Sequence, residues 1–331
     1  MSRTWIVIPN RDGLRFLPEC LGSVAEHSPN AAVCFVDNAS TDGSVEYVGR
    51  HHPNVRVIEL EMNLGFVQAT NLGLLAGLKA GADAFVLLNN DTRVSPEWLE
   101  SLEAASAIEP ELGIVGSWQD DFAGHASPRT KAILAAAGLD YCDQSFLPRL
   151  VDADWVEGSC MWIRREVIDA VGFLDPLFAP AYFEEVDFCR RARRAGWRVA
   201  MSTTSVIEHF GAGSSQSTPA RRRQRILSER NYLIYHAADP ACNSPKSMGT
   251  LLAKAVRRGL KAWRRRELSL SEWAAAVAGL PSRVPGIAAK NARDRRNRPC
   301  PVLGDRSLST LEQRYYADRV AEMELMTARP H

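Results

Sequence analysis

The first 120 residues alternate short apolar runs with segments of helical spacing. Four runs have the length and composition of buried strands: Thr4–Pro9, Ala32–Asp37, Val55–Leu60 and Ala84–Leu88. The segments between them predict helices over Leu14–Glu26, from about Ser44, and over Val67–Lys79. Continuous apolar strands that alternate with helices predict a mainly parallel sheet covered on both faces.

The pattern is more mixed from residue 113 to about residue 213. Three further strands are predicted: "GIVGSW" from Gly113, Trp155–Arg165, and "WRVAMS" from Trp197. Within this region Glu184–Ala195 predicts a helix, which Gly196 ends. Before it, Ser95 followed by Pro96 is typical of the start of another helix. Gly211–Pro219 is rich in Gly and Ser and predicts a loop.

The chain from about residue 239 differs in composition. Between Met248 and Trp263 the apolar residues recur at helical spacing, with Lys and Arg on the other side. Ser269 and Glu272 form a predicted capping box for a second helix, which ends near Gly279. The expected organisation is an α/β unit over residues 1–238, with halves of about 1–120 and 121–238, and a basic helical extension over 239–331.

The composition is that of an ordinary globular protein, with 46% hydrophobic and 24% charged residues. The net charge of +1 hides an asymmetry, because residues 254–298 hold 13 lysines and arginines against three acidic residues. Two interpretations stay open. Residues 248–298 could lie on an anionic membrane surface, or pack on the α/β unit with a solvated basic face. No nucleic-acid-binding motif accompanies the charge, so we do not expect nucleic acid as a partner.

The seven cysteines are scattered and show no zinc-type spacing. Several lie in apolar runs, where a reduced cysteine behaves as a small hydrophobic residue. The chain enters the strand-like "TWIVIP" directly, and no stretch reaches the ~18 apolar residues of a membrane-spanning helix. We therefore expect a cytoplasmic protein, which the basic segment could bring to the inner face of the cell membrane.

Polar side chains follow two of the predicted strands where each strand ends. Asp37 closes the second strand in "VDNASTDGS", and Asn89, Asn90 and Asp91 follow the fourth in "LLNNDT". Open α/β sheets bind ligands at this edge, where Asp37 could contact a base or ribose. The oxygens of Asn89 and Asp91 suit Mg²⁺ or Mn²⁺. Both segments are also typical of turns, and an Asx-turn could instead cap the next helix.

Two further polar clusters lie in the second half of the α/β unit. Glu184, Glu185 and Asp187 occupy the first turn of a predicted helix directly after two aromatic residues. Partial burial there could raise a carboxyl pKa and create a general base. Acidic residues at a helix start, with arginines at its end, also complement the helix dipole without any catalytic role. His209 ends an apolar run and could be a metal ligand or a structural histidine.

The order and spacing of these segments resemble the family 2 glycosyltransferases of GT-A fold, in particular the rhamnosyltransferase-like branch that builds bacterial surface polysaccharides. The resemblance spans about residues 4–237. It rests on eight segments: "IPNRDG…LPECLGSV", "VDNASTDGS", "NLGFVQATNLG", "LLNNDT…PEWL", "GSCMWIRREVIDAVGFLDPLF", "YFEEVDFCRRARRAGWRV", "IEHFGAGSS" and "RNYLIY". It implies an α/β fold with a Rossmann-like, mainly parallel sheet and flanking helices, to which the C-terminal helical extension is added.

The resemblance assigns one group of residues to nucleotide-sugar binding: Pro9, Asn10, Asp12, Asp37, Asn63, Gly65, Asn71, Asn89 and Asn90. Asp37 matches the acidic residue that contacts the nucleobase, with the Pro9–Asp12 loop beside it. Asn63, Gly65 and Asn71 match an element that lines the nucleotide pocket. These roles imply a nucleotide diphosphate sugar as the donor.

The resemblance also implies a divalent cation, Mn²⁺ or Mg²⁺, and a catalytic base. Asn89 and Asp91 match the two ends of the Asp-x-Asp metal motif, and His209 matches a histidine that can complete the metal shell. Because Asn89 replaces the first aspartate, the motif has one carboxylate fewer. Glu185 falls on the proposed base, where the usual pattern has "ED", and Glu184 and Asp187 are its neighbours.

The implied function is inverting transfer of a deoxyhexose, with dTDP-rhamnose as the favoured donor, to a growing surface glycan or a lipid-linked acceptor. A dinucleotide-dependent oxidoreductase does not fit, because the loop after the first strand, "IPNRDG", has no GxGxxG. A third interpretation is a catalytically degenerate protein that binds nucleotide sugar or glycan and anchors a membrane assembly. The changes at Asn89 and Glu185 keep this third interpretation open.

Overall fold

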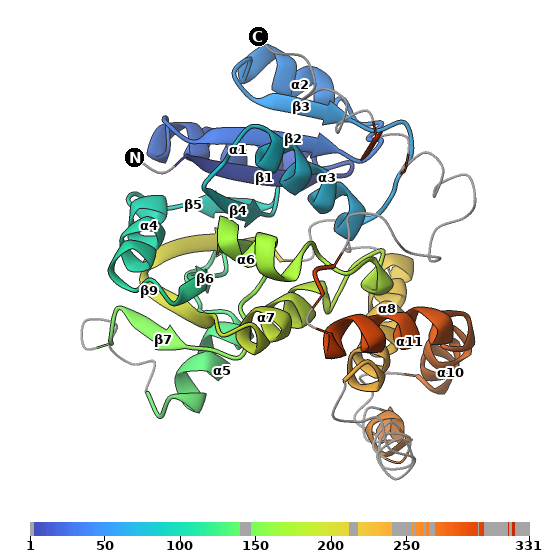
Figure 1. Cartoon of the computed structure of the whole chain (residues 1–331). Helices are drawn as coiled ribbons and strands as arrows, with labels where there is room; N and C mark the ends of the chain where they lie inside the picture. Colours follow the sequence, from blue (N-terminus) through green and yellow to red (C-terminus); the bar gives the residue numbers. More distant parts are fainter. Residues whose placement is uncertain are drawn as a thin grey trace.

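The computed structural model describes residues 3–139, 147–211, 218–239, 269–296 and 298–300, together with 253, 256–260, 263–264, 317 and 320–321. Within these ranges a nine-stranded sheet lies between helices, and the helices after residue 218 lie together beside α7 (Figure 1). Most of the helix predicted over Met248–Trp263 falls outside the described residues.

The N-terminal half is a parallel sheet in the order β3-β2-β1-β4. Its strands are β1 (Thr4–Asn10), β2 (Ala32–Asp37), β3 (Arg56–Glu59) and β4 (Ala84–Leu88). Its helices are α1 (Leu17–His27), preceded by the 3-10 turn η1 (Leu14–Phe16), α2 (Ser44–His51) and α3 (Phe66–Lys79). All the elements predicted here are confirmed, within one residue at most ends.

The two faces of the sheet carry separate hydrophobic cores. In β1, Trp5 and Val7 face the core that α3 covers, whereas Ile6 and Ile8 face the core beneath α1 and α4 (Trp98–Ile108). Residues that alternate along a strand point to opposite faces, so a strand buried on both sides is apolar throughout. Gly73 allows α3 to pack closely, since a Cβ there would lie 2.3 Å from the Val7 side chain.

The C-terminal half makes the sheet mixed. Its strands are β5 (Thr92–Val94), β6 (Leu112–Asp120), β7 (Leu150–Asp152), β8 (Cys160–Arg164) and β9 (Arg198–His209). β8 runs antiparallel to both β4 and β6 and so joins the halves, while β6 and β9 are parallel. Four of the eight strand pairings are antiparallel. An apolar run predicts that a strand is buried but not its direction, so the parallel prediction holds for the first half only.

Several predicted boundaries in this half differ from the structure, and β6 and β9 both extend beyond the strands expected there. The helix expected at Ser95 begins at Trp98, because Glu97 has a left-handed backbone (φ 59°) that a helix cannot include. The strand expected over Trp155–Arg165 is restricted to β8. Most of the loop expected over Gly211–Pro219 lies outside the described residues, and its last two residues belong to α8 (Thr218–Ala237).

The remaining helices surround the C-terminal half. They are α5 (Pro128–Ala136), α6 (Arg165–Val171), the 3-10 turn η3 (Pro176–Phe178), α7 (Glu184–Arg194), α10 (Leu270–Ala278), the 3-10 turn η5 (Pro281–Arg283) and α11 (Val284–Arg295). The capping box of Ser269 and Glu272 at the start of α10 is confirmed. Among the described helices, none is both long enough and apolar enough to cross a bilayer.

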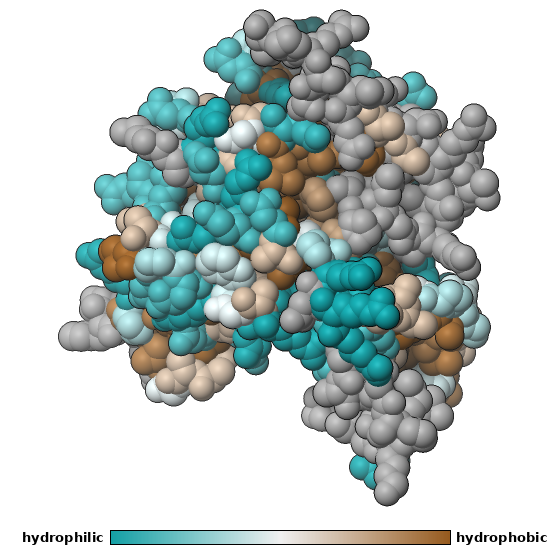
Figure 2. All heavy atoms as spheres, in the orientation of Figure 1, coloured by the Kyte–Doolittle hydropathy of each residue, from teal (hydrophilic) through white to brown (hydrophobic). Residues whose placement is uncertain are grey.

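The described part of the extension packs on the α/β unit. α10 lies against α8, and Arg225 of α8 pairs with Glu272 of α10. α11 inserts Lys290, which is 1% exposed, beneath α7, while its last turns present a hydrophilic surface (Figure 2). The packed interpretation of the basic segment therefore applies to α10 and α11.

Candidate active site

The carboxyl edges of β1, β2 and β4 bring three predicted donor-binding residues into one hydrogen-bond chain. Asn10 donates to the Asp37 carboxylate (3.0 Å) and accepts from the Asn90 amide. The second Asp37 oxygen accepts from the Ser40 backbone N–H (2.8 Å). Asp37 is 1% exposed, so it organises the turn as the plainer interpretation expected. Contact between Asp37 and a nucleobase stays a prediction.

The loop after β1 is held against the turn after β2. Pro9 is the penultimate residue of β1, and Asp12 has a left-handed backbone (φ 48°). The Asp12 carboxylate accepts from the Thr41 backbone N–H (2.8 Å), while its own N–H donates to the Ser40 hydroxyl (2.9 Å). These bonds preorganise the loop beside the edge where a nucleotide would lie.

The "NLGF" element adopts a fixed bend before α3. The Asn63 side chain accepts from the Gly65 N–H (2.9 Å), and Gly65 has a φ of 85°. A Cβ at Gly65 would lie 2.6 Å from Pro180, so glycine is required by both conformation and space. The element thus connects the nucleotide half to the loop that precedes α7.

Asn71 does not line the nucleotide pocket as the resemblance implied. It is 0% exposed, and its amide group donates to the Leu174 carbonyl (2.9 Å) and accepts from the Leu174 N–H (3.1 Å). Both polar atoms of the side chain are therefore used to clamp the segment between α6 and η3. The sequence pattern places Asn71 on α3 correctly, but it does not show that this helix face points into the core.

The predicted metal ligands meet where β4 and β9 end. His209 Nε2 lies 3.1 Å from Asp91 Oδ1 and 3.3 Å from the Asn89 amide nitrogen. β5 pairs with β9 so that Thr92 faces His209, which fixes this approach. Neither Asn89 nor Asp91 caps a helix, because β5 follows them directly. The segment therefore does not cap a helix as the Asx-turn interpretation expected, although Asn90 and Asp91 do lie in a turn.

The donor atoms at this point fit a divalent cation that is also held by a substrate. Among the described residues, three or more His, Cys, Asp or Glu do not gather into a protein-only metal site. One carboxylate and one imidazole are present, with an amide oxygen of Asn89 within reach on reversal of that amide. Mg²⁺ and Mn²⁺ commonly take one or two carboxylates and complete their shell with phosphate oxygens and water.

The candidate base lies at the strained start of α7. Tyr182 and Phe183 both have left-handed backbones, with φ of 80° and 74°, a conformation that costs about 1–3 kcal/mol per residue. Asn231 of α8 compensates by donating to the carbonyl oxygens of Phe178, Ala181 and Tyr182. The turn that presents Glu184 and Glu185 is therefore held by a buried side chain from the "RNYLIY" segment.

Glu184 and Glu185 have the electrostatic properties expected of a proton acceptor. Burial and, secondarily, the nearby Glu157 charge raise the pKa of Glu185 to about 7. Burial and the Glu185 charge raise the pKa of Glu184 well above its usual value. Within the described residues, one carboxyl oxygen of each lacks a hydrogen-bond partner. A base near neutrality with an unused oxygen can take a proton from a bound hydroxyl.

Glu157 is a site residue that the sequence analysis missed. It lies in the loop before β8, and its carboxylate accepts from the Ser127 hydroxyl (3.0 Å). Burial raises the pKa of Glu157 above its usual value, and the hydrogen bond from Ser127 opposes this rise in part. The segment that carries Glu157 adjoins the base candidate, since a Cβ on Gly158 would lie 3.7 Å from Glu185 Cβ. The only sequence signal was one acidic residue inside an apolar segment, which we had assigned to a strand.

Asp187 was a candidate general base as part of the acidic cluster with Glu184 and Glu185, but the structure gives it a supporting role. It is 0% exposed and contacts Arg190 (2.8 Å), Arg191 (2.8 Å) and Lys290 (2.9 Å). Burial alone would raise the pKa of Asp187, but these cations lower it far below its usual range. Lys290 also contacts Asp175 (3.3 Å) and Asp294 (2.9 Å). A carboxylate enclosed by three cations cannot accept a proton from a substrate at neutral pH.

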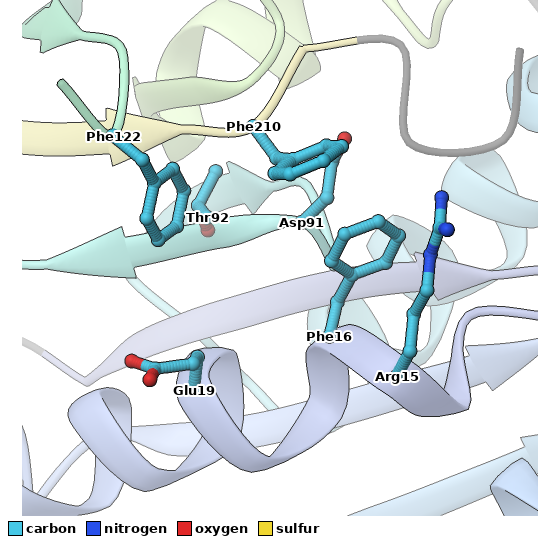
Figure 3. Close-up of a pocket in the computed structure, with 7 residues that line it drawn as sticks. All are labelled: Arg15, Phe16, Glu19, Asp91, Thr92, Phe122 and Phe210. Atoms are coloured by element: carbon cyan, nitrogen blue, oxygen red, sulfur yellow. The ribbon is translucent and has the colours of Figure 1, made fainter. Parts of the chain in front are cut away.

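A cavity of about 310 Å³ opens beside Asp91 (Figure 3). Its walls are mainly aromatic: Phe16, Phe122 and Phe210, with Arg15, Glu19 and Thr92. The rings of Phe16 and Phe210 lie 5.0 Å apart, and the Arg15 guanidinium lies over Phe16. The cavity therefore adjoins the metal candidate on the side of α1.

Residues 5–172 match the family described as Glycosyl transferase family 2, which is just over half of the chain. The chain belongs to this family. The resemblance noted in the sequence is thereby confirmed at the level of the family.

One sequence relative of this glycosyl transferase agrees with that assignment, and a solved structure shares its fold. The N-acetylglucosaminyl-diphospho-decaprenol L-rhamnosyltransferase of Mycobacterium tuberculosis is 28% identical over 224 residues, which cover 60% of this chain and 72% of the relative. The mannosyltransferase PcManGT of Pyrobaculum calidifontis, in complex with GDP-Man and Mn²⁺, has a TM-score of 0.54 at 17% identity, covering 99% of this chain and 88% of that one.

GalNAc-T7 with UDP, GalNAc and Mn²⁺ has a TM-score of 0.53 at 16% identity. Its alignment covers 71% of this chain but only 47% of GalNAc-T7. At these identities the two structures show a shared fold alone. The GT-A fold expected from the sequence is therefore confirmed, with the mixed sheet described above.

Proposed function

We propose that this family 2 glycosyl transferase moves a deoxyhexose, with rhamnose favoured, from a nucleotide diphosphate to a glycan or lipid-linked acceptor with inversion. The proposal rests on the segment that precedes β8. A Cβ on Gly158 would lie 3.7 Å from Glu185 Cβ. The next residue, Ser159, donates to Gln119, whose amide nitrogen lies 2.8 Å from His209 Nδ1. The candidate base and the candidate metal ligand are therefore neighbours across one site. The rhamnosyltransferase relative supports the choice of sugar.

In the proposed mechanism the protein holds the diphosphate at one end of the site and the acceptor at the other. A divalent cation bound by Asp91 and His209 would neutralise the charge that develops on the leaving diphosphate. Glu185 accepts the proton of the attacking hydroxyl, on the face of the sugar opposite the diphosphate. Attack from that face inverts the anomeric centre, so a product of retained configuration would refute the mechanism.

The donor is tested by calorimetric titration of the protein with dTDP-rhamnose, UDP-glucose and UDP-galactose, each with and without Mn²⁺. We expect dTDP-rhamnose to bind most tightly, and Mn²⁺ to strengthen its binding in the wild type but not in Asp91→Asn. If dTDP-rhamnose bound equally well with and without Mn²⁺, the cation would have no part in the proposed mechanism. Preference for either UDP-hexose would leave the transferase assignment intact but overturn the choice of donor.

We further propose that the acceptor is met at an anionic membrane surface. Val256, Leu260 and Trp263 recur at helical spacing and are each more than 40% exposed. Arg257 and Arg264 are also exposed beside them. Apolar side chains flanked by arginines are typical of helices that lie in a membrane interface.

Replacing both Leu260 and Trp263 by alanine should weaken binding to vesicles of anionic phospholipid about tenfold or more, because each large apolar side chain contributes roughly 1.5–3 kcal/mol when buried. Sedimentation with vesicles measures this. Ile108→Ala is the matched control, since Ile108 is 76% exposed on α4, outside the basic segment. Equal sedimentation of the double variant and the wild type would contradict the membrane proposal.

A further inference from the structure

A buried glutamine holds the histidine of the candidate metal site. Gln119 lies near the end of β6 and is 7% exposed. Its amide nitrogen lies 2.8 Å from His209 Nδ1, and its amide oxygen accepts from the Ser159 hydroxyl. The Gln119 backbone is fixed as well, because its carbonyl accepts from the Ser127 N–H (2.8 Å). The side chain therefore has few conformations other than reversal of its amide.

This contact links the orientation of the Gln119 amide to the position of the proton on His209. When the Gln119 amide donates to Nδ1, Nδ1 must be the unprotonated nitrogen of a neutral ring. The proton then lies on Nε2, which can donate to Asp91 Oδ1 at 3.1 Å. The Asn89 amide nitrogen lies 3.3 Å from Nε2, so in this state the Asn89 amide must reverse and present its oxygen to the ring. In this state the Nε2 lone pair that a cation needs is blocked by its own proton.

Cation binding requires the other tautomer. A proton on Nδ1 needs an acceptor, and the reversed Gln119 amide would supply its oxygen. Ser159 can follow, because a hydroxyl accepts as readily as it donates. The ring changes tautomer by losing the Nε2 proton to solvent and gaining one at Nδ1, without a change in net charge.

We propose that Gln119, supported by Ser159, is a positioning residue that selects the tautomer of His209 and so gates cation binding. The inference rests on the proposed cation site at Asp91 and His209. It goes further because it names Gln119 as the residue that sets the state of this site. With a proton on His209 Nε2 the site is closed to the cation, and with a proton on Nδ1 it is open. That choice depends on one amide that touches neither cation nor substrate.

Two substitutions at Gln119 should act in opposite directions on Mn²⁺ affinity. Gln119→Glu leaves only acceptor atoms, which holds the proton on Nδ1 and should tighten Mn²⁺ binding about tenfold. Gln119→Met removes the acceptor and should weaken it about 10–100-fold. Binding is measured from the electron paramagnetic resonance of free Mn²⁺. The control is Gln68→Met, which removes a second buried glutamine amide, on α3, and should leave the affinity unchanged.

A spectroscopic measurement separates this inference from the proposed function. Long-range ¹H–¹⁵N spectra of the cation-free protein report the tautomer of His209, whose signals are assigned by their loss in His209→Asn. We expect an Nε2 proton in the wild type and an Nδ1 proton in Gln119→Glu. The same ring state in both proteins would overturn the role of Gln119. Absence of Mn²⁺ binding with the tautomer shift present would refute the cation site alone.

Discussion

Replacing Lys290 by methionine should lower the free energy of unfolding by about 3–5 kcal/mol, as expected when one partner of a buried ionic cluster is removed. The ammonium group is 0% exposed and contacts Asp175, Asp187 and Asp294. Without it, these buried carboxylates lose their shared partner and repel one another. Urea unfolding followed by tryptophan fluorescence at pH 7 measures the change.

Arg295→Met provides the matched control for this prediction. Arg295 lies on the same helix, also carries one positive charge, and is exposed. It should change stability by no more than about 0.5 kcal/mol. Adding Asp175→Asn to Lys290→Met should recover part of the loss, since it removes one of the buried carboxylates that Lys290 neutralises, although Arg293 also pairs with Asp175. If Lys290→Met and Arg295→Met were equally stable, α11 would not be anchored as the structure shows.

Glu185→Gln should lower the turnover rate about 10²–10⁴-fold, the usual contribution of a general base, while leaving donor affinity unchanged. The wild-type rate should rise with pH through about 7, the pKa of Glu185, because only the ionised carboxylate accepts a proton. Initial rates between pH 5.5 and 8.5, with calorimetry of donor binding, test both statements. The pH dependence should be absent from the residual activity of the variant.

Although Glu185→Gln should lower activity, it should raise the free energy of unfolding at alkaline pH. The pKa of Glu185 is raised from 4.5 to about 7 on folding, so the favourable contribution of its neutral form is complete below about pH 4.5 and is lost as pH rises through 7. Glutamine is neutral throughout, and Glu185→Gln should be more stable than the wild type at pH 8 but not at pH 4.5.

Glu166→Gln, at an exposed position on α6, is the control for both effects. Full turnover in Glu185→Gln would falsify the base assignment. A wild-type protein that binds donor but has no turnover to lose would instead support the degenerate binding protein.

The nucleotide half of the molecule was predictable because its signals are local. Its inner strands β1, β2 and β4 are mainly apolar. Asp37 ends β2 and Asn90 lies two residues after β4, so parallel pairing places them at one edge. The register of β1 and β2 sets Asn10 opposite Asp37, which makes the hydrogen bond between them possible. The family resemblance added roles to residues whose approximate place was already determined.

The supporting residues were not predictable because their partners are distant in sequence. Asn71 bonds to Leu174, and Asp187 bonds to Lys290, in each case 103 residues away. Periodicity places Asp187 in the first turn of α7 but cannot show that this helix face is buried against another helix. Glu157 was missed for a related reason, since its importance comes from neighbours on other elements.

The contact between Lys290 and Asp187 also sets an order of events during synthesis. At about 5–20 residues per second, a ribosome needs about 5–20 s to add the 103 residues that separate the two positions. Throughout that interval the strands of the nucleotide half are already available to pair. The turn that presents Glu185, however, has not received its anchor. A nascent chain halted before residue 290 should therefore contain a formed nucleotide half and an unanchored α7.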